Sequence, residues 1–232
     1  MTQATHGDML DEMDEPLVVV RRCREPETIE RILERDYFDE PVRSFSTGLR
    51  RAFASEWCAK RDEIYFVVAE VDGKHAGFVF GHAMGDGLVK FFARRNPRHL
   101  PQLLLTWLRM RLSPNEKGPV SEAASVPPDT SGVEAEFAAL GIQNIESHFV
   151  WSPDARSGRI ALLSVHPDYR GYGLARRLLD GVAEHMSAGG VKTIEAHIDP
   201  YNISSVRAFL KSGYDIWRMA DKDFLARRSV TG

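Results

Sequence analysis

Two glycines two positions apart, Gly171 and Gly173, lie in residues 165–180, which read VHPDYRGYGLARRLLD. Three arginines accompany them: Arg170, Arg176 and Arg177. Glycine lets the backbone approach a ligand closely because it carries no Cβ. The first amides of a helix are unpaired and carry partial positive charge, so they attract anions. The segment therefore predicts a loop that binds phosphate or pyrophosphate at the start of a helix.

Three alternatives compete with this interpretation. The two glycines could be simple turn residues, since glycine pairs are common in turns. A P-loop is excluded because GxxxxGK[ST] is absent. A dinucleotide-binding fingerprint is closer, with Asp199 ending the next strand, but Arg176 occupies the third glycine position, where a small residue is needed. The lead-in from Val165 to Gly171 is also too long for that tight turn.

The surrounding elements place the loop in a mixed α/β sheet. Residues 159–166 and 192–198 read as strands joined by a helix over 171–188, a crossover that makes the two strands parallel. A further helix over 202–211 and strand material from Tyr214 follow. Upstream, the two runs around Asp72-Gly73 predict a hairpin over 63–83. A strand at 17–22, a helix from Pro26, a helix over 42–60 and a strand over 144–152 complete the prediction.

Two motifs resemble those of the GNAT superfamily of acetyl-CoA-dependent N-acetyltransferases. VHPDYRGYGLA resembles its acetyl-CoA pyrophosphate loop (Arg or Gln, two residues, Gly, one residue, Gly or Ala), matched here by Arg170, Gly173 and Ala175. NISSVRAFLKSGYDI resembles the family's helix that begins at asparagine and ends in glycine and an aromatic residue. The resemblance covers residues 159–220. It implies a central twisted, mostly antiparallel sheet with one parallel, splayed strand pair, flanked by helices, plus a helical insertion.

The resemblance also implies a cofactor site for acetyl-CoA as cosubstrate, with no metal. Loop amides from Arg170 to Ala175 would cradle the pyrophosphate, and the strand before them would pair with the pantetheine arm. Asn202 would contact that arm, although asparagine is equally suited to cap the helix that follows. The expected cofactor contacts are Leu163, Val165, Arg170, Gly171, Tyr172, Gly173, Leu174, Ala175, Asn202 and Phe209.

The implied reaction is direct attack of an amine on the acetyl thioester. Many members carry a tyrosine as general acid seven residues after the asparagine, but here that position is Phe209. An alkyl ammonium, with a pKa of about 10.4, must first lose a proton. The candidate bases are Glu195, His197, Glu146, His148 and His166. Of these, Glu195 and His197 share one face of a strand and are our catalytic candidates, together with the backbone near Ser164 or Val165 for the oxyanion. Both side chains could instead be exposed strand positions.

Residues 85–145 form an insertion between the hairpin and the motif strand. Its first part is basic, with no acid between Asp86 and Glu116: Lys90, Arg94, Arg95, Arg98, Arg109 and Arg111. The insertion could be a helical excursion with solvated arginines or a cationic lid over an acidic acceptor such as a nucleotide-linked amino sugar. Residues 90–112 could also contact an anionic membrane or a partner.

Composition sets the remaining expectations. The chain has 232 residues and a net charge of −3, which gives no argument for nucleic-acid binding. Cys23 and Cys58 form no CxxC pair, and no secretory or membrane-spanning pattern is present, so we expect a cytoplasmic protein. We expect residues 1–16 to form a disordered acidic tail and residues 17–228 to form a single domain. We expect the protein to be a monomer or a homodimer. The expected function is acetylation of a small-molecule amine; the alternatives are a non-catalytic acetyl-CoA-binding module and a protein N-acetyltransferase.

Overall fold

The computed structural model describes residues 16–34, 46–59, 63–83, 96–112, 130–146, 156–199, 202–220 and 223–230. The predicted acidic tail lies outside the described residues except for Pro16. The same holds for residues 84–95 and 113–129 of the insertion, and for His148.

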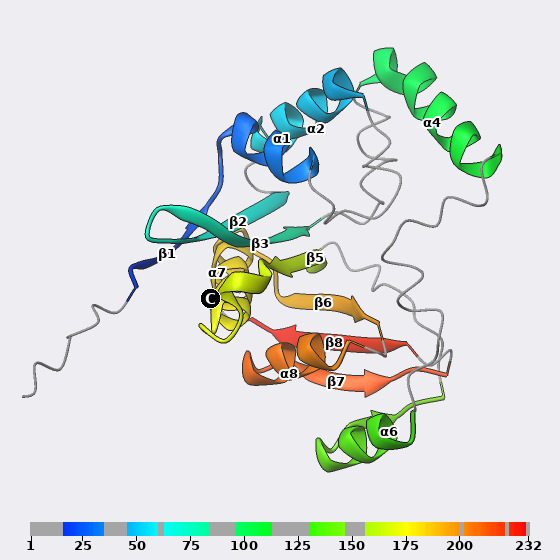
Figure 1. Cartoon of the computed structure of the whole chain (residues 1–232). Coiled ribbons are helices and arrows are strands. Elements are labelled where there is room, and N and C mark those ends of the chain that lie inside the picture. Colours follow the sequence, from blue (N-terminus) through cyan, green and yellow to red (C-terminus); the bar gives the residue numbers. More distant parts are fainter. Residues whose placement is uncertain are drawn as a thin grey trace, which may run out of the picture.

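An eight-stranded sheet with the order β1-β2-β3-β5-β6-β8-β7-β4 forms the centre of the molecule (Figure 1). Its pairs are antiparallel except for β5–β6 and β4–β7, which confirms the mixed-sheet prediction. The strands are β1 (Val18–Arg22), β2 (Ile64–Val71), β3 (Lys74–His82), β4 (Gln143–Asn144), β5 (Ser157–Val165), β6 (Thr193–Ile198), β7 (Asp215–Arg218) and β8 (Phe224–Ser229).

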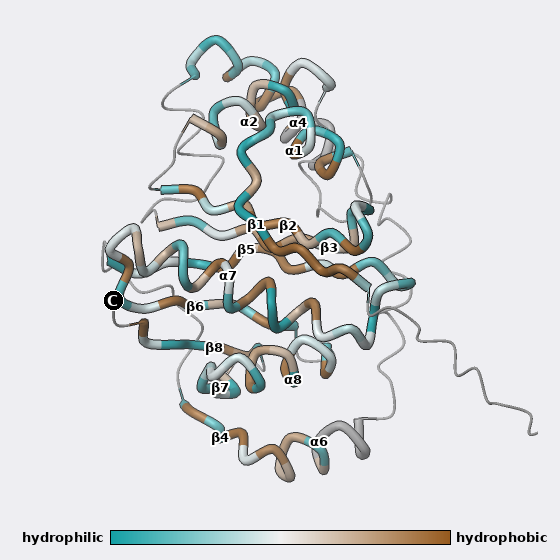
Figure 2. Tube along the Cα trace, turned by 90° about the vertical axis from the view of Figure 1, so that its left-hand side faces the viewer, coloured by the Kyte–Doolittle hydropathy of each residue, from teal (hydrophilic) through white to brown (hydrophobic). Residues whose placement is uncertain are grey.

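Helices cover both faces of the sheet and create two hydrophobic cores. On one face α1 (Pro26–Glu34) and α2 (Thr47–Ala59) pack on β2 and β3. On the other, α7 (Leu174–Ala188) and α8 (Ile203–Lys211) pack on the strands from β2 to β8. Figure 2 shows the strongly hydrophobic strands lying between these layers. The remaining helical elements are η2 (Pro97–His99), α4 (Leu100–Leu112), α6 (Thr130–Ala139) and η3 (Pro167–Tyr169).

The predicted hairpin is confirmed as β2 and β3. Asp72 and Gly73 both have positive φ, 50° and 73°, which is the conformation that a tight two-residue hairpin turn requires. The Asp72 carboxylate also accepts a hydrogen bond from the Leu17 amide at 2.9 Å. The hairpin places β3 beside β5, the strand that leads into the glycine loop.

The parallel ladder between β5 and β6 ends part-way along both strands. Its last Cα partners are Ile160 and Ala196, although β5 continues to Val165 and β6 to Ile198. On the other side of β5, Gly81 faces Ile160 and Phe80 faces Leu162, so Ala161 is an extra residue in a β-bulge. The bulge lies where the pairing stops, which confirms the predicted splay of this strand pair.

Three elements differ from the sequence prediction. Helix α2 begins at Thr47 rather than near residue 42. The strand expected over 144–152 is β4, two residues long and parallel to β7, while residues 147–155 lie outside the described ranges. Helix α6 was not predicted. Its Phe137 packs edge-on against Phe224 at 4.7 Å between ring centroids, so this part of the insertion belongs to the main core.

Candidate active site

Beyond Ile160 and Ala196, β5 and β6 separate and leave a wedge-shaped gap, which we call the wedge. A cavity of about 390 Å³ lies there. The end of β5, the glycine loop and the start of α8 contribute its walls. It brings most of the predicted cofactor contacts together, because both sequence motifs line it. The lining residues are Leu163, Ser164, Val165, Tyr169, Arg170, Gly171, Gly173, Leu174, Ala175, Asn202, Ser204, Ser205 and Ala208.

The glycine loop is held by short-range hydrogen bonds. His166 caps η3 by accepting from the Asp168 amide at 3.4 Å, and the Arg170 amide donates to the Pro167 carbonyl at 3.1 Å. The Arg170 amide is therefore not available to a ligand, which corrects the prediction that the cradle begins there. Gly171 and Gly173 have φ of 92° and 70°, a left-handed conformation that side chains disfavour.

The start of α7 presents unpaired amides to this cavity. Gly173 is its N-cap, and no side chain in the described part of the chain caps the helix there. Within the same described part, the amides of Gly171, Tyr172 and Gly173 donate to no acceptor. Leu174 is buried in the α7 core and fixes the helix start against the sheet. This arrangement fits a pyrophosphate, which would accept hydrogen bonds from several backbone amides at once.

The end of β5 offers a second set of backbone donors. The His166 amide donates to the Ala76 carbonyl on β3 at 2.8 Å. Because successive amides of a strand point to opposite sides, those of Val165 and Leu163 point away from β3 and toward the wedge. This narrows the predicted oxyanion donor, given as Ser164 or Val165, to Val165, with Leu163 as a further donor. The same amides suit the carbonyl groups of a pantetheine arm.

Asn202 has the capping role that the sequence allowed. Its Oδ1 accepts from the Ser205 amide at 3.0 Å at the start of α8. Because Asn202 also lines the cavity, its Nδ2 amino group is the part that suits a ligand carbonyl. The two predicted roles are therefore compatible, with a different atom for each.

Two predicted cofactor contacts lie outside the cavity lining. The Tyr172 side chain is exposed to solvent. Phe209 is buried in the α7–α8 core and packs edge-on against Tyr214 at 4.9 Å between ring centroids. Burial raises the pKa of Tyr214 above its ordinary value, and its buried side chain does not line the cavity, so it is not placed to protonate a leaving group there. The neighbouring Ala208 lines the cavity in place of Phe209.

Glu195 and His197 share one face of β6 as predicted, but their surroundings differ. Glu195 is fully buried, and its Oε1 accepts from Nε and Nη2 of Arg227 at 3.0 and 2.7 Å. On the adjacent strand its Cα partner is Arg159, whose pKa is lowered by burial and partly restored by the charge of Glu195. A fully buried carboxylate whose Oε1 already accepts two hydrogen bonds from Arg227 is not accessible to an acceptor amine. Glu195 therefore fits the role of a structural anion better than that of a base.

His197 lies just beyond the end of the β5–β6 ladder and is accessible, although it does not line the cavity. It is the first β6 residue beyond the ladder, and 42% of its side chain is exposed. Its Nε2 lies 2.9 Å from Oδ2 of Asp223. The structure therefore favours His197 over Glu195 among the predicted bases.

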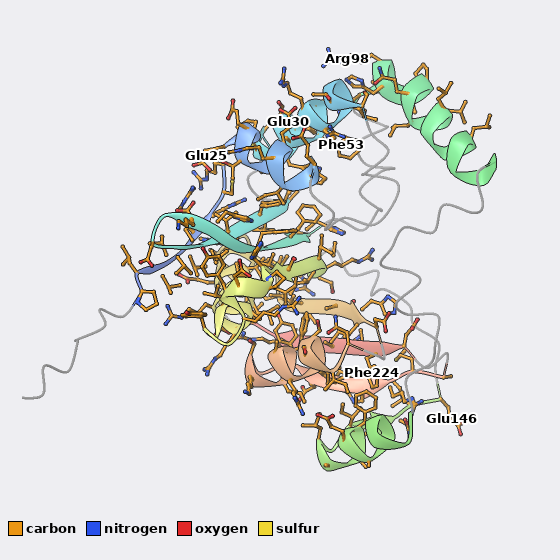
Figure 3. All side chains as sticks on the ribbon, in the orientation of Figure 1. Glu25, Glu30, Phe53, Arg98, Glu146 and Phe224 are labelled. Carbon is orange, nitrogen blue, oxygen red and sulfur yellow. The ribbon has the colours of Figure 1, made fainter. Side chains whose placement is uncertain are left out.

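The other predicted bases are less suitable. Glu146 follows β4, the edge strand of the sheet, and Figure 3 shows it near α6, away from β5 and β6. His166 is engaged in capping η3, with its Nδ1 3.6 Å from the Asp168 carboxylate. His148 lies outside the described residues.

Four lining residues were missed by the sequence prediction: Tyr169, Ser204, Ser205 and Ala208. The last three follow Asn202 on one side of α8, so helical periodicity from Asn202 could have found them. Tyr169 is in η3 and packs against His166 at 5.9 Å between ring centroids. Tyr169 lines the cavity because of how the loop folds, and the motif alone does not predict that fold.

The described part of the basic insertion lies away from the wedge. Figure 3 shows Arg98 beside the start of α4, beyond α2 and remote from β5 and β6. Leu103 of α4 packs into the α1–α2 core, while Leu100, Leu104, Leu105 and Leu108 are exposed. Arg94 and Arg95 lie outside the described ranges. Of the helices within these ranges, none is both long and apolar enough to cross a membrane.

Comparisons with known proteins agree with this geometry. Residues 136–214 match the family model described as the acetyltransferase (GNAT) family. A GNAT-family acetyltransferase from Streptococcus pneumoniae has 14% identity and a TM-score of 0.50, over 92% of this chain and 99% of that one. The PaiA N-acetyltransferase of Thermoplasma acidophilum, solved in complex with coenzyme A, has 11% identity, the same TM-score and the same coverage. A search of curated proteins found no match.

The match of residues 136–214 to the GNAT family model, and the similarity of the fold to GNAT structures, agree with the resemblance that the two motifs predicted. The family that matches over these residues is one of acetyltransferases.

Proposed function

We propose that this protein transfers the acetyl group of acetyl-CoA to the primary amine of a small molecule by direct attack. One observation carries the proposal. The loop amides at the start of α7, the end of β5 and the cap of α8 line one cavity at the splay of the sheet. The catalytic candidate His197 lies beside that splay on β6.

The cavity supplies donors for each part of the cosubstrate. Amides from Gly171 to Ala175 would hold the pyrophosphate, with exposed Arg170 and Arg177 adding positive charge nearby. The amides of Leu163 and Val165 and the Nδ2 group of Asn202 would hold the pantetheine arm. This arrangement would place the thioester near the Ala161 bulge, where β5 and β6 separate.

Acetyl transfer from a thioester to an amine depends on a base for the amine more than on an acid for the leaving thiolate. The attacking amine must be neutral, and His197 is accessible to take its proton. The leaving group is a thiolate, whose parent thiol has a pKa of about 8.5, so it departs without a proton donor. The replacement of the usual tyrosine by Phe209 is therefore compatible with turnover. Backbone donation from Val165 would stabilise the oxyanion.

A panel of amines tests the proposal through acetyl-CoA-dependent thiol release. We expect release with at least one small primary amine, and the panel includes amino sugars with and without phosphate to test for an acidic acceptor. Release only with peptides or proteins would favour protein N-acetylation. Saturable acetyl-CoA binding with no release for any amine would favour a non-catalytic binding module.

A further inference from the structure

The alternation of side chains along the strands shows on which face of the sheet His197 lies. Glu195 and His197 alternate with Ala196, so both lie on the face of Arg159 and its partner His82. On β3, His82 and Phe78 share that face, and Phe78 is the partner of Ser164. His197 and Ser164 therefore flank the wedge on the same face, which is the face opposite α7.

Asp223 is fixed where it can hold the His197 ring. It directly precedes β8, and its carbonyl accepts from the Met219 amide, just after β7, at 2.8 Å. In the β6–β8 ladder the next residue, Phe224, pairs with Ile198. The contact between Nε2 and Oδ2 at 2.9 Å thus joins two residues positioned by the same ladder.

The contact selects one protonation form of the neutral imidazole. A carboxylate can only accept, so Nε2 must carry the proton that is donated to Asp223. The lone pair then resides on Nδ1. When Nδ1 takes a proton, the nearby carboxylate stabilises the resulting imidazolium, as in other catalytic pairs of histidine and aspartate.

Two acidic side chains near this end of the sheet therefore have different roles. Glu195 is buried and its Oε1 is engaged by two N–H groups of Arg227. Asp223 is partly exposed, and its Oδ2 contacts Nε2 of His197. Because Glu195 is engaged by Arg227, Asp223 is the carboxylate that contacts the accessible His197.

We propose that Asp223 is a positioning residue that keeps the proton of His197 on Nε2, so that Nδ1 is the base for the acceptor amine. This inference rests on the proposed function. In the step itself the amine nitrogen bonds to the acetyl carbon, the carbon–sulfur bond breaks and sulfur leaves as thiolate. The amine proton goes to Nδ1 and from there to solvent.

Ring ¹⁵N spectroscopy of the full chain tests the positioning directly, with the His197 signals assigned by their loss in His197→Gln. In the wild type we expect the tautomer protonated on Nε2. In Asp223→Ala we expect a mixture of tautomers, and Asp223→Glu, which keeps a carboxylate, should restore part of the wild-type signal. A wild-type ring protonated on Nδ1, or one unchanged in Asp223→Ala, would overturn the proposal.

Kinetics with the best amine of the panel complete the test. Asp223→Ala should lower kcat by about 10–100-fold while leaving the KM for acetyl-CoA unchanged. Asp215→Ala, which removes an exposed carboxylate of the same hairpin, should retain wild-type kcat. An active wild type with full kcat in Asp223→Ala would overturn the positioning role and leave the proposed function standing. A wild type inactive with every amine would overturn both, whatever the ring signals show.

Discussion

Ile160 on β5 and Ala196 on β6 are the last partners of the parallel ladder, and the cavity begins directly beyond them. The extra residue Ala161 on the other side of β5 lets Ile160 and Leu163 both pack toward α7 despite their odd spacing. The end of β5 thus stays attached to β3 while it separates from β6. This single irregularity creates the space in which both sequence motifs meet.

A side chain at Gly173 should weaken CoA binding. Gly173 has a φ of 70° and lines the cavity, so an alanine there is strained and adds a Cβ to the binding surface. We expect Gly173→Ala to lower the free energy of unfolding by about 1–2 kcal/mol. It should also raise the dissociation constant for CoA at least about tenfold, equivalent to about 1.4 kcal/mol, in calorimetric titration.

Gly190→Ala is the matched control for this change. Gly190 has a φ of 86° at the other end of α7, and a Cβ there meets open space outside the cavity. It should show the same loss of stability with unchanged CoA affinity. Equal affinities in both variants would mean that the loop does not contact CoA.

A side chain at Gly77 should displace the strand that lines the cavity. A Cβ there would lie 2.7 Å from the Ser164 carbonyl oxygen and 3.2 Å from the Val165 Cα, and backbone atoms cannot move aside cheaply. We expect Gly77→Ala to lower the free energy of unfolding by about 1–3 kcal/mol and to weaken CoA binding. Gly48→Ala in α2, where a Cβ meets nothing within 4 Å, should show neither effect. Chemical denaturation measures the first effect, and unaltered stability of Gly77→Ala would contradict the packing described for β5.

Restoring the family's usual tyrosine should not accelerate turnover. Phe209 is buried against Tyr214, so the hydroxyl of Phe209→Tyr would be placed in the core. We expect the free energy of unfolding to fall by about 1–3 kcal/mol, the usual penalty for a buried unsatisfied hydroxyl. The kcat for acetyl transfer should not rise. A clear gain in kcat would show that position 209 reaches the leaving sulfur and that an acid is missing.

Alkaline pH should reduce the contribution of Cys23 to stability. Burial raises the pKa of the Cys23 thiol to about 12, whereas the unfolded thiol ionises near its ordinary value of about 8.5. Above that ordinary value the unfolded chain loses a proton that the folded chain retains, so the free energy of unfolding decreases as pH rises toward 12. The pH slope between 8 and 11 should therefore be shallower in Cys23→Ala under reducing conditions. Identical slopes would indicate that the thiol is not buried.

The sequence predicted those parts of the site that depend on local chemistry. The glycine loop, the cap by Asn202 and the hairpin at Asp72-Gly73 each follow from a few adjacent residues whose backbone conformation is restricted. The bulge at Ala161 and the pairing of His197 with Asp223 depend on strand register, which is set by contacts far apart along the chain. The burial of Glu195 could not be predicted for the same reason, since Arg159 and Arg227 come from two other strands. Helix α6 lacks an amphipathic pattern strong enough to mark it, and tertiary contacts such as Phe137 with Phe224 hold it in place.

Amide chemical-shift mapping with CoA tests most directly whether the wedge is the cosubstrate site. On titration of CoA into the ¹⁵N-labelled full chain, the largest changes should occur at Gly171, Gly173, Leu163 and Val165. The amides of α4 should not change. An absence of changes at millimolar CoA, or changes concentrated between α2 and α4, would contradict the account.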